Sequence, residues 1–236
     1  MSNKGRLPAS GLGLLYKDLK KMKINTSMFT THPETWNIIT NILPLAILTY
    51  LALTHTTSQK NLSPRQQLES AAVHAACIVC QLCSLAYHAL NGLVSPRAAR
   101  ALYCLDLAGV CCMSFGSPWL YATGIGTEYS GLYTGTLFAC TAWCLFLLAE
   151  AAVLDQETAR AERWILVLSA IGNFPALARP STAAATATIL AGYVVFYRLR
   201  FPSPVIGHAL WHCAVFAGQL GFVVDAAAAA ASTTAD

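Results

Sequence analysis

The feature that most limits the fold of this chain is a series of seven apolar stretches, each close to the roughly 20 residues that cross a bilayer as a helix. Apolar residues make up 56% of the chain and charged residues only 11%, whereas soluble domains carry about 25% charged residues. The sequence therefore predicts an all-α integral membrane protein, a seven-transmembrane helix bundle. The stretches cover approximately residues 36–55, 69–93, 99–121, 131–153, 163–178, 182–199 and 203–229.

The distribution of Lys and Arg predicts the orientation of this bundle. A cytosolic N-terminus and an outside C-terminus place 12 of the 15 basic residues on the cytosolic side, which is the usual bias of membrane proteins. G-protein-coupled receptors have the opposite orientation, so the charge pattern argues against that class. The charge lies in short connectors and in the N-terminal tail, so we expect no nucleic-acid partner. We divide the chain into a basic cytosolic tail (1–33), a seven-transmembrane domain (34–230) and a C-terminal tail (231–236).

Two histidines one helical turn apart, His208 and His212, stand near the start of the last apolar stretch. The spacing places both rings on one helix face, with Cβ atoms about 6 Å apart, close enough for one metal ion to bridge them. Ionisable residues inside a membrane are rare and functional by default. A buried pair can also be a hydrogen-bonded contact between helices, and the pair alone does not decide between these interpretations.

Other polar residues fall at the same predicted depth. Ser84 and His88 lie near the cytosolic end of the second stretch, and Asp106 lies two turns into the third. The chain therefore brings three histidines, one carboxylate and one hydroxyl to one level in the cytosolic half of the membrane.

This set of residues contains the groups of a catalytic Zn²⁺ site. Three neutral imidazoles, from His88, His208 and His212, leave a fourth position for water, whose pKa then falls to about 7. Asp106 is the candidate general base, and Ser84 is the candidate group that holds the water or the developing oxyanion. The alternatives are an ion pair of Asp106 with a residue such as Arg100, and a hydrogen bond of Ser84 to its own helix.

The remaining histidines and cysteines have simpler interpretations. His74 lies about 21 Å along a helix from His88 and cannot join the same metal. All nine cysteines fall in apolar stretches, which predicts packing rather than disulfides. Thr31 and Glu34 match a capping box that opens the first helix.

Three motifs resemble the progestin and adipoQ receptor family, which includes adiponectin receptors and haemolysin-III-like proteins. Its opening motif resembles Glu34-Thr35-Trp36-Asn37-Ile38-Ile39-Thr40. Its Ser-x-x-x-His and Leu-Asp-Tyr-x-Gly motifs resemble Ser84 to His88 and Leu105 to Gly109. Its closing motif resembles His208-x-x-x-His212. The chain departs from these motifs at Ile39, Asn41, Leu107, Gly207 and Ala209.

The resemblance implies a zinc held by His88, His208 and His212, with Ser84 and Asp106 beside it. The related alkaline ceramidases use a similar set of residues. We therefore expect an adiponectin-receptor-type multi-pass membrane protein that hydrolyses a lipid amide such as ceramide. The alternatives are a non-catalytic receptor or sensor with a structural zinc and an unknown extracellular ligand, and a transporter with a polar relay. The sequence does not distinguish the plasma membrane from an endomembrane.

Overall fold

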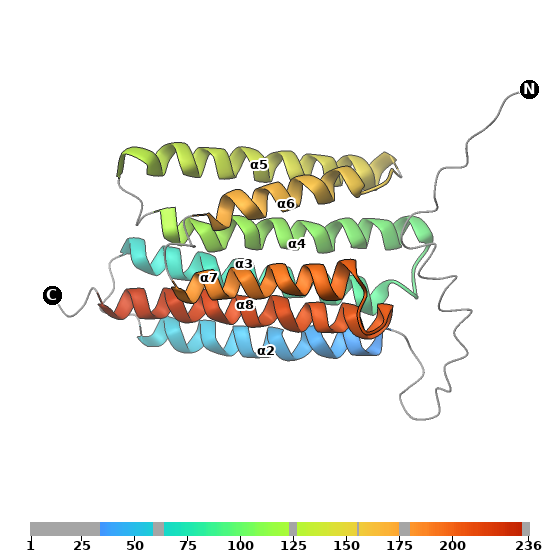
Figure 1. Ribbon diagram of the computed structural model, residues 1–236, viewed down its shortest axis with the longest axis horizontal. Coiled ribbons are helices and arrows are strands. Elements are labelled where there is room, and N and C mark those ends of the chain that lie inside the picture. Colours follow the sequence, from blue (N-terminus) through green and yellow to red (C-terminus); the bar gives the residue numbers. More distant parts are fainter. Residues whose placement is uncertain (1–33, 59–63, 123–126, 155, 175–179, 233–236) are drawn as a thin grey trace, which may run out of the picture.

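The computed structural model describes residues 34–58, 64–122, 127–154, 156–174 and 180–232, and these residues form helices and their connectors without a strand. The helices run side by side along the length of the molecule (Figure 1). The predicted basic tail lies outside the described residues. The elements are α2 (Thr35–Ser58), α3 (Pro64–Leu90), α4 (Pro96–Ala122), α5 (Thr127–Leu154), α6 (Ala159–Asn173), α7 (Pro180–Gly192), the π-helix η2 (Tyr193–Arg198) and α8 (Pro204–Ser232).

These seven helical segments, with η2 continuing α7, match the seven predicted apolar stretches, and the boundaries differ by a few residues. Five of the described helices are long and apolar enough to cross a membrane, namely α2, α3, α4, α5 and α8. The other two are shorter, because α6 has 15 residues and α7 has 13 before η2 begins. An integral multi-pass membrane protein is therefore confirmed, and the crossing by α6 and α7 stays a prediction.

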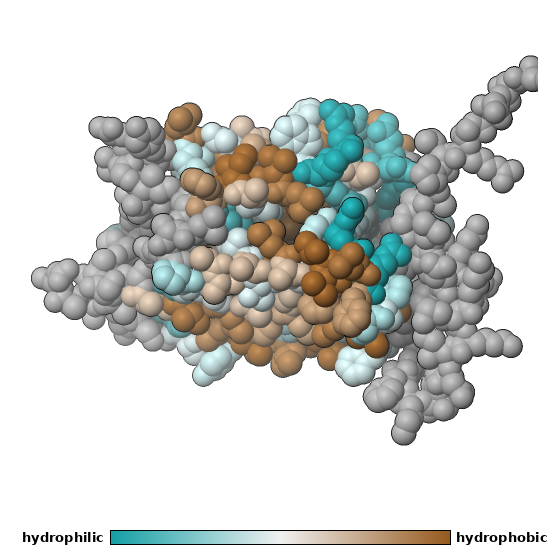
Figure 2. Space-filling model, in the orientation of Figure 1, coloured by the Kyte–Doolittle hydropathy of each residue, from teal (hydrophilic) through white to brown (hydrophobic). Residues whose placement is uncertain are grey.

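Apolar side chains cover the outside of the bundle while polar ones lie inside it. Leu43, Leu132 and Phe138 are each at least 60% exposed, whereas Asn41 and Gln219 are at most 1% exposed. Figure 2 shows hydrophobic residues over the middle of one face and hydrophilic residues gathered towards one end. This arrangement fits a lipid environment, where the outer surface faces hydrocarbon and backbone groups bond within helices.

Helix α3 lies at the centre of the bundle and packs against α2, α4 and α8. A small residue allows its close approach to α4. A Cβ atom on Gly109 would lie 3.0 Å from the Cα atom of Cys80, so any larger residue there would push the two helices apart. Gly109 follows Asp106 by one helical turn, and Cys80 precedes Ser84 by one turn. The glycine therefore brings the carboxylate of α4 next to the hydroxyl of α3.

A tight turn joins η2 to α8. Arg200 in this turn has a φ of 55°, in the left-handed region. A Cβ atom on Gly207 would lie 2.8 Å from the backbone oxygen of Phe196 and 2.9 Å from that of Phe201, so glycine is required there. The close contact holds the first turn of α8 against η2, and it places the ring of the next residue, His208, 5.9 Å from the ring of Tyr197.

Helices α2, α4, α6 and α8 begin at one end of the bundle, and α3 and η2 finish there. We call this the histidine end. It lies on the right in Figure 1. The orientation predicted from the basic residues places this end towards the cytosol.

The predicted orientation and the odd number of crossings can be tested together with terminal tags. In sealed vesicles whose cytosolic face points outward, protease should remove an N-terminal tag and spare a C-terminal one, since the two termini should lie on opposite sides. Immunoblotting for each tag gives the result, and detergent lysis is the control that both tags are cleavable. Removal of both tags from sealed vesicles would mean an even number of crossings. If protease spared the N-terminal tag and removed the C-terminal one, the orientation would be the reverse of the predicted one.

Candidate metal centre

Three histidines from two helices meet at the histidine end of the bundle. His88 lies in the last turn of α3, and His208 and His212 lie in the first turns of α8. Their possible ligand atoms all lie within 4.8 Å of one another, and no other such group of three or more His, Cys, Asp or Glu occurs among the described residues. His88 and His212 are buried, and His208 is partly buried. The structure thus brings together all three predicted ligands.

The spacing of these rings fits a tetrahedral metal ion. The Nε2 atoms of His88 and His208 are 3.2 Å apart. Two imidazole nitrogens that each lie about 2.0–2.1 Å from a zinc ion, at a tetrahedral angle, are about 3.3–3.4 Å apart. The ring of His212 lies 4.9 Å from that of His88 and 4.7 Å from that of His208 between centroids. The site is therefore compatible with a metal bound by three histidines.

Glu34, just before α2, orients the ring of His88. Its Oε2 atom lies 2.7 Å from Nδ1 of His88 and accepts a second hydrogen bond from Asn37 at 2.7 Å. Burial raises the pKa of Glu34, but these hydrogen bonds and the charge of His88 lower it to about 2. An ionised carboxylate at Nδ1 holds the proton there and leaves the Nε2 lone pair for a metal. The predicted capping box pairs Glu34 with Thr31, which lies outside the described residues, so it stays a prediction.

Asn41, two turns into α2, contacts the ring of His212. Its Nδ2 atom lies 2.6 Å from Nδ1 of His212 and donates a hydrogen bond to the backbone oxygen of Asn37 at 2.7 Å. An imidazole that binds a metal through Nε2 must carry its proton on Nδ1. With Nδ2 of Asn41 in this position, Nδ1 of His212 accepts and the ring carries its proton on Nε2. A metal at Nε2 of His212 would require the amide of Asn41 to turn its oxygen to the ring and to give up its bond to Asn37.

Ser84 and Asp106 form a pair beside the histidines. The hydroxyl of Ser84 donates a hydrogen bond to the carboxylate of Asp106, which also lies close enough to His88 for their charges to interact. Arg100, the predicted alternative partner of Asp106, donates from Nη1 to the backbone oxygen of Gln156. The structure thus places both predicted catalytic residues together at the histidine end, as expected from their depth in the sequence.

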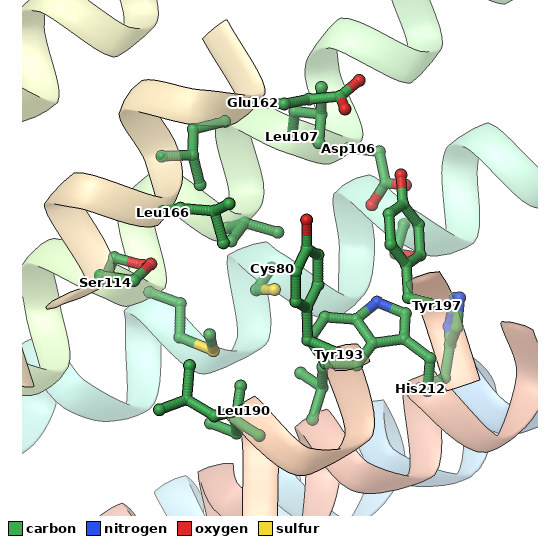
Figure 3. A pocket seen from close by; sticks show the side chains of 18 of the residues that line it. Cys80, Asp106, Leu107, Ser114, Glu162, Leu166, Leu190, Tyr193, Tyr197 and His212 are labelled. Carbon is green, nitrogen blue, oxygen red and sulfur yellow. The ribbon is translucent and has the colours of Figure 1, made fainter. Parts of the chain in front are cut away.

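A cavity of about 440 Å³ begins at this group of residues. His208, His212, Ser84 and Asp106 line it, while His88 is not among its lining residues. Figure 3 shows Asp106, Tyr197 and His212 on one side of the cavity and Leu166, Ser114 and Leu190 on the other. The volume is within the usual range of pockets for small ligands. Most of the other lining side chains are apolar, among them Val110, Met113, Ile165, Leu190, Val215 and Phe222.

Among the described residues, neither the other two histidines, His55 and His74, nor any cysteine belongs to the group of possible metal ligands. His74 accepts or donates a hydrogen bond with the backbone oxygen of Ser70 and packs edge-on against His55, so the prediction that it does not join the metal site is confirmed. None of the nine cysteines forms a disulfide, and five of them are buried. The predicted packing role of the cysteines agrees with this burial.

The sequence analysis did not identify Glu34 and Asn41 as residues of the site, although both contact its histidines. With Asn37, these residues recur at intervals of three and four, which places them on one face of an otherwise apolar helix. This polar stripe was the available signal. It faces the histidines because α2 packs against both α3 and α8.

Comparison with known families agrees with the geometry. A model of the haemolysin-III-related family matches residues 29–223, which is most of the chain. The chain belongs to the haemolysin-III-related family. This is the family of the adiponectin and progestin receptors, so the resemblance seen in the sequence is confirmed. No curated protein matches the sequence.

The match to the haemolysin-III-related family covers every residue of the candidate site, from Glu34 to His212. Membership supports a multi-pass membrane protein with a clustered histidine triad.

Removing the charge of Glu34 should weaken metal binding without removing a ligand. In Glu34→Gln the side chain keeps its size, but Nδ1 of His88 loses its carboxylate partner, and loss of such a partner typically costs about 10–100-fold in metal affinity. Competition with a metal chelator of known affinity, on protein in detergent, measures the change. Glu157→Gln, which removes an exposed carboxylate outside the site, is the matched control. Equal affinities for wild type and both variants would contradict the role of Glu34.

Proposed function

We propose that this protein is an intramembrane zinc hydrolase that cleaves a lipid amide such as ceramide at the histidine end of the bundle. One observation carries the proposal: His208, His212, Ser84 and Asp106 open onto an apolar cavity of about 440 Å³. A metal that only fastens helices together needs no cavity at its side. A metal that acts on a lipid does need one, with an apolar part for the chains and polar groups near the metal.

His88, His208 and His212 would hold the ion through nitrogen atoms that already lie near one another. A zinc ion bound by three protein ligands supplies a coordination position for water and lowers the pKa of that water to about 7. Glu34 and Asn41 keep two of the three rings in place by their contacts with Nδ1 of His88 and of His212. Three neutral imidazoles add no negative charge, so the ion keeps its full positive charge for this chemistry.

Asp106 is suited to move the proton. Its carboxylate would accept the proton that the attacking water loses and give it to the leaving nitrogen of the amide. Ser84 donates a hydrogen bond to this carboxylate in the structure and so orients it. When Asp106 is protonated, the Ser84 hydroxyl can turn towards the negative oxygen that develops on the amide carbonyl.

The cavity beyond these residues is suited to hydrocarbon. Helices α4, α6, α7 and α8 supply apolar lining residues such as Val110, Ile165, Leu190 and Val215. Such walls exclude water and strengthen the electrostatic interactions of Asp106 with the reacting groups. We therefore assign the acyl or sphingoid chain of the substrate to this part of the cavity.

The competing function is a membrane receptor or sensor in which a structural zinc joins α3 to α8 and an extracellular ligand acts from the other side. Structural zinc sites are usually closed by four protein ligands. The described residues group three ligands and no fourth His, Cys, Asp or Glu within the same distance. This count favours the open, catalytic kind of site.

Replacing Asp106 separates the two functions. Asp106→Asn should keep zinc occupancy, because Asp106 is not one of the three proposed ligands. It should hydrolyse a ceramide at least about 100-fold more slowly, since loss of general-base help typically costs about 10²–10⁴ in rate. Release of fatty acid by purified protein, with zinc content measured on the same sample, gives both quantities. Asp225→Asn removes a carboxylate at the far end of α8 and should retain the wild-type rate.

Two results would count against this proposal. Wild-type protein that releases no more fatty acid than a metal-stripped sample, over a panel of ceramides, would favour the receptor. An active Asp106→Asn variant would remove Asp106 from the mechanism while leaving the metal's role intact.

A further inference from the structure

Glu162 is a second carboxylate on the wall of the cavity, and no step proposed above uses it. It lies in the first turn of α6, at the histidine end. Its Oε1 atom accepts hydrogen bonds from Thr158 at 2.7 Å and from the hydroxyl of Tyr103 at 3.1 Å. Among the described residues no group donates to Oε2. One oxygen of Glu162 therefore fastens α6 to α4, and the other remains available to a ligand.

Aromatic rings stand beside this carboxylate. The hydroxyl of Tyr103 lies 3.2 Å from that of Tyr197, so Glu162, Tyr103 and Tyr197 form a continuous chain of polar contacts. Tyr197 stacks on Tyr193 with ring centroids 5.4 Å apart, and Trp211 packs against both rings at 6.0 and 5.8 Å. All of these rings line the cavity. Figure 3 shows Glu162, Asp106, Tyr193 and Tyr197 around the cavity.

The charges on the cavity wall have one sign. The described lining residues include the carboxylates of Glu162 and Asp106 and no Lys or Arg. Of the arginines next to Glu162 in the sequence, Arg160 lies over the ring of Trp143 on α5, and Arg163 is exposed and outside the lining. Within a largely apolar space, the carboxylate of Glu162 attracts cations on its side of the cavity. Aromatic faces beside a carboxylate are the usual environment of bound ammonium groups.

We propose that the cavity binds an amphiphilic long-chain amine, with its protonated amino group at Glu162 and the adjacent tyrosines. The hydrocarbon chain then lies along the apolar wall towards Leu166 and Leu190. This inference concerns binding alone and does not require the hydrolysis proposed above. The two are chemically related, because cleavage of a lipid amide releases an amine, and a carboxylate beside the reaction site is suited to receive it.

A purely structural role for Glu162 is the competing explanation. A carboxylate in the first turn of a helix interacts favourably with the helix dipole, and the bonds to Thr158 and Tyr103 fasten two helices together. That role uses Oε1 alone and makes no distinction between the head groups of bound ligands. Selectivity for a cationic head is therefore the quantity that separates the two roles.

The test compares three ligands with the same twelve-carbon chain and different heads: dodecylamine, dodecyltrimethylammonium and dodecan-1-ol. The full chain is purified in a neutral detergent at pH 7, and thermal-shift titration gives the apparent affinity of each ligand. We expect both cations to bind about tenfold to a hundredfold more tightly than the alcohol, as a charge-assisted interaction does. Dodecyltrimethylammonium cannot ligate a metal, so its binding excludes coordination to the histidine site as the cause.

The variants then assign this selectivity to one residue. Glu162→Gln should lose most of the preference for the two cations and keep the affinity for dodecan-1-ol, whereas Glu157→Gln should behave as wild type. Wild-type protein that binds the alcohol as tightly as the amines would overturn the proposal, and this measurement does not depend on the folding of any variant. A Glu162→Gln variant that keeps the full cation preference would overturn the assignment to Glu162. Neither result bears on whether the protein hydrolyses ceramide.

Discussion

The structure depends on the approach of three imidazole rings inside an apolar bundle. The Nε2 atoms of His88 and His208 lie 3.2 Å apart, close enough for one ring to donate a hydrogen bond to the other or for both rings to bind one cation. The neighbouring elements hold the three rings in this arrangement. Glu34 and Asn41 bind the Nδ1 atoms of His88 and His212, and Gly207 lets α8 begin close enough to η2.

The polar end and the apolar cavity are parts of one arrangement. The helices bring the histidines, Ser84 and Asp106 together within about three turns of the histidine end, and most of the other side chains that line the cavity are apolar. A lipid that enters from the membrane can therefore keep its chains in hydrocarbon-like surroundings while its polar group reaches Ser84, Asp106 and the histidines. The second carboxylate, Glu162, lies at this end as well. Both proposals therefore depend on polar residues at the histidine end that border an apolar cavity.

Much of this arrangement could be predicted from the sequence because a membrane limits the alternatives. Long apolar stretches must be helices, and the common depth of His88, Asp106 and His208 follows from counting residues along them. The role of Glu34 could not be predicted, since a carboxylate before a helix has a local explanation in helix capping. Its actual partner is 54 residues away, and that contact depends on how α2 packs against α3. The π-helix η2 that continues α7 also escaped prediction, because hydropathy does not show where an α-helix changes to a π-helix.

The central claim is an open metal site with three histidine ligands, and X-ray absorption at the zinc edge of purified protein tests it most directly. The account predicts one zinc per chain, with three imidazole nitrogens and one oxygen at about 2.0–2.1 Å. A sulfur neighbour at about 2.3 Å, a shell of four imidazoles, or protein that binds no zinc at all would contradict it.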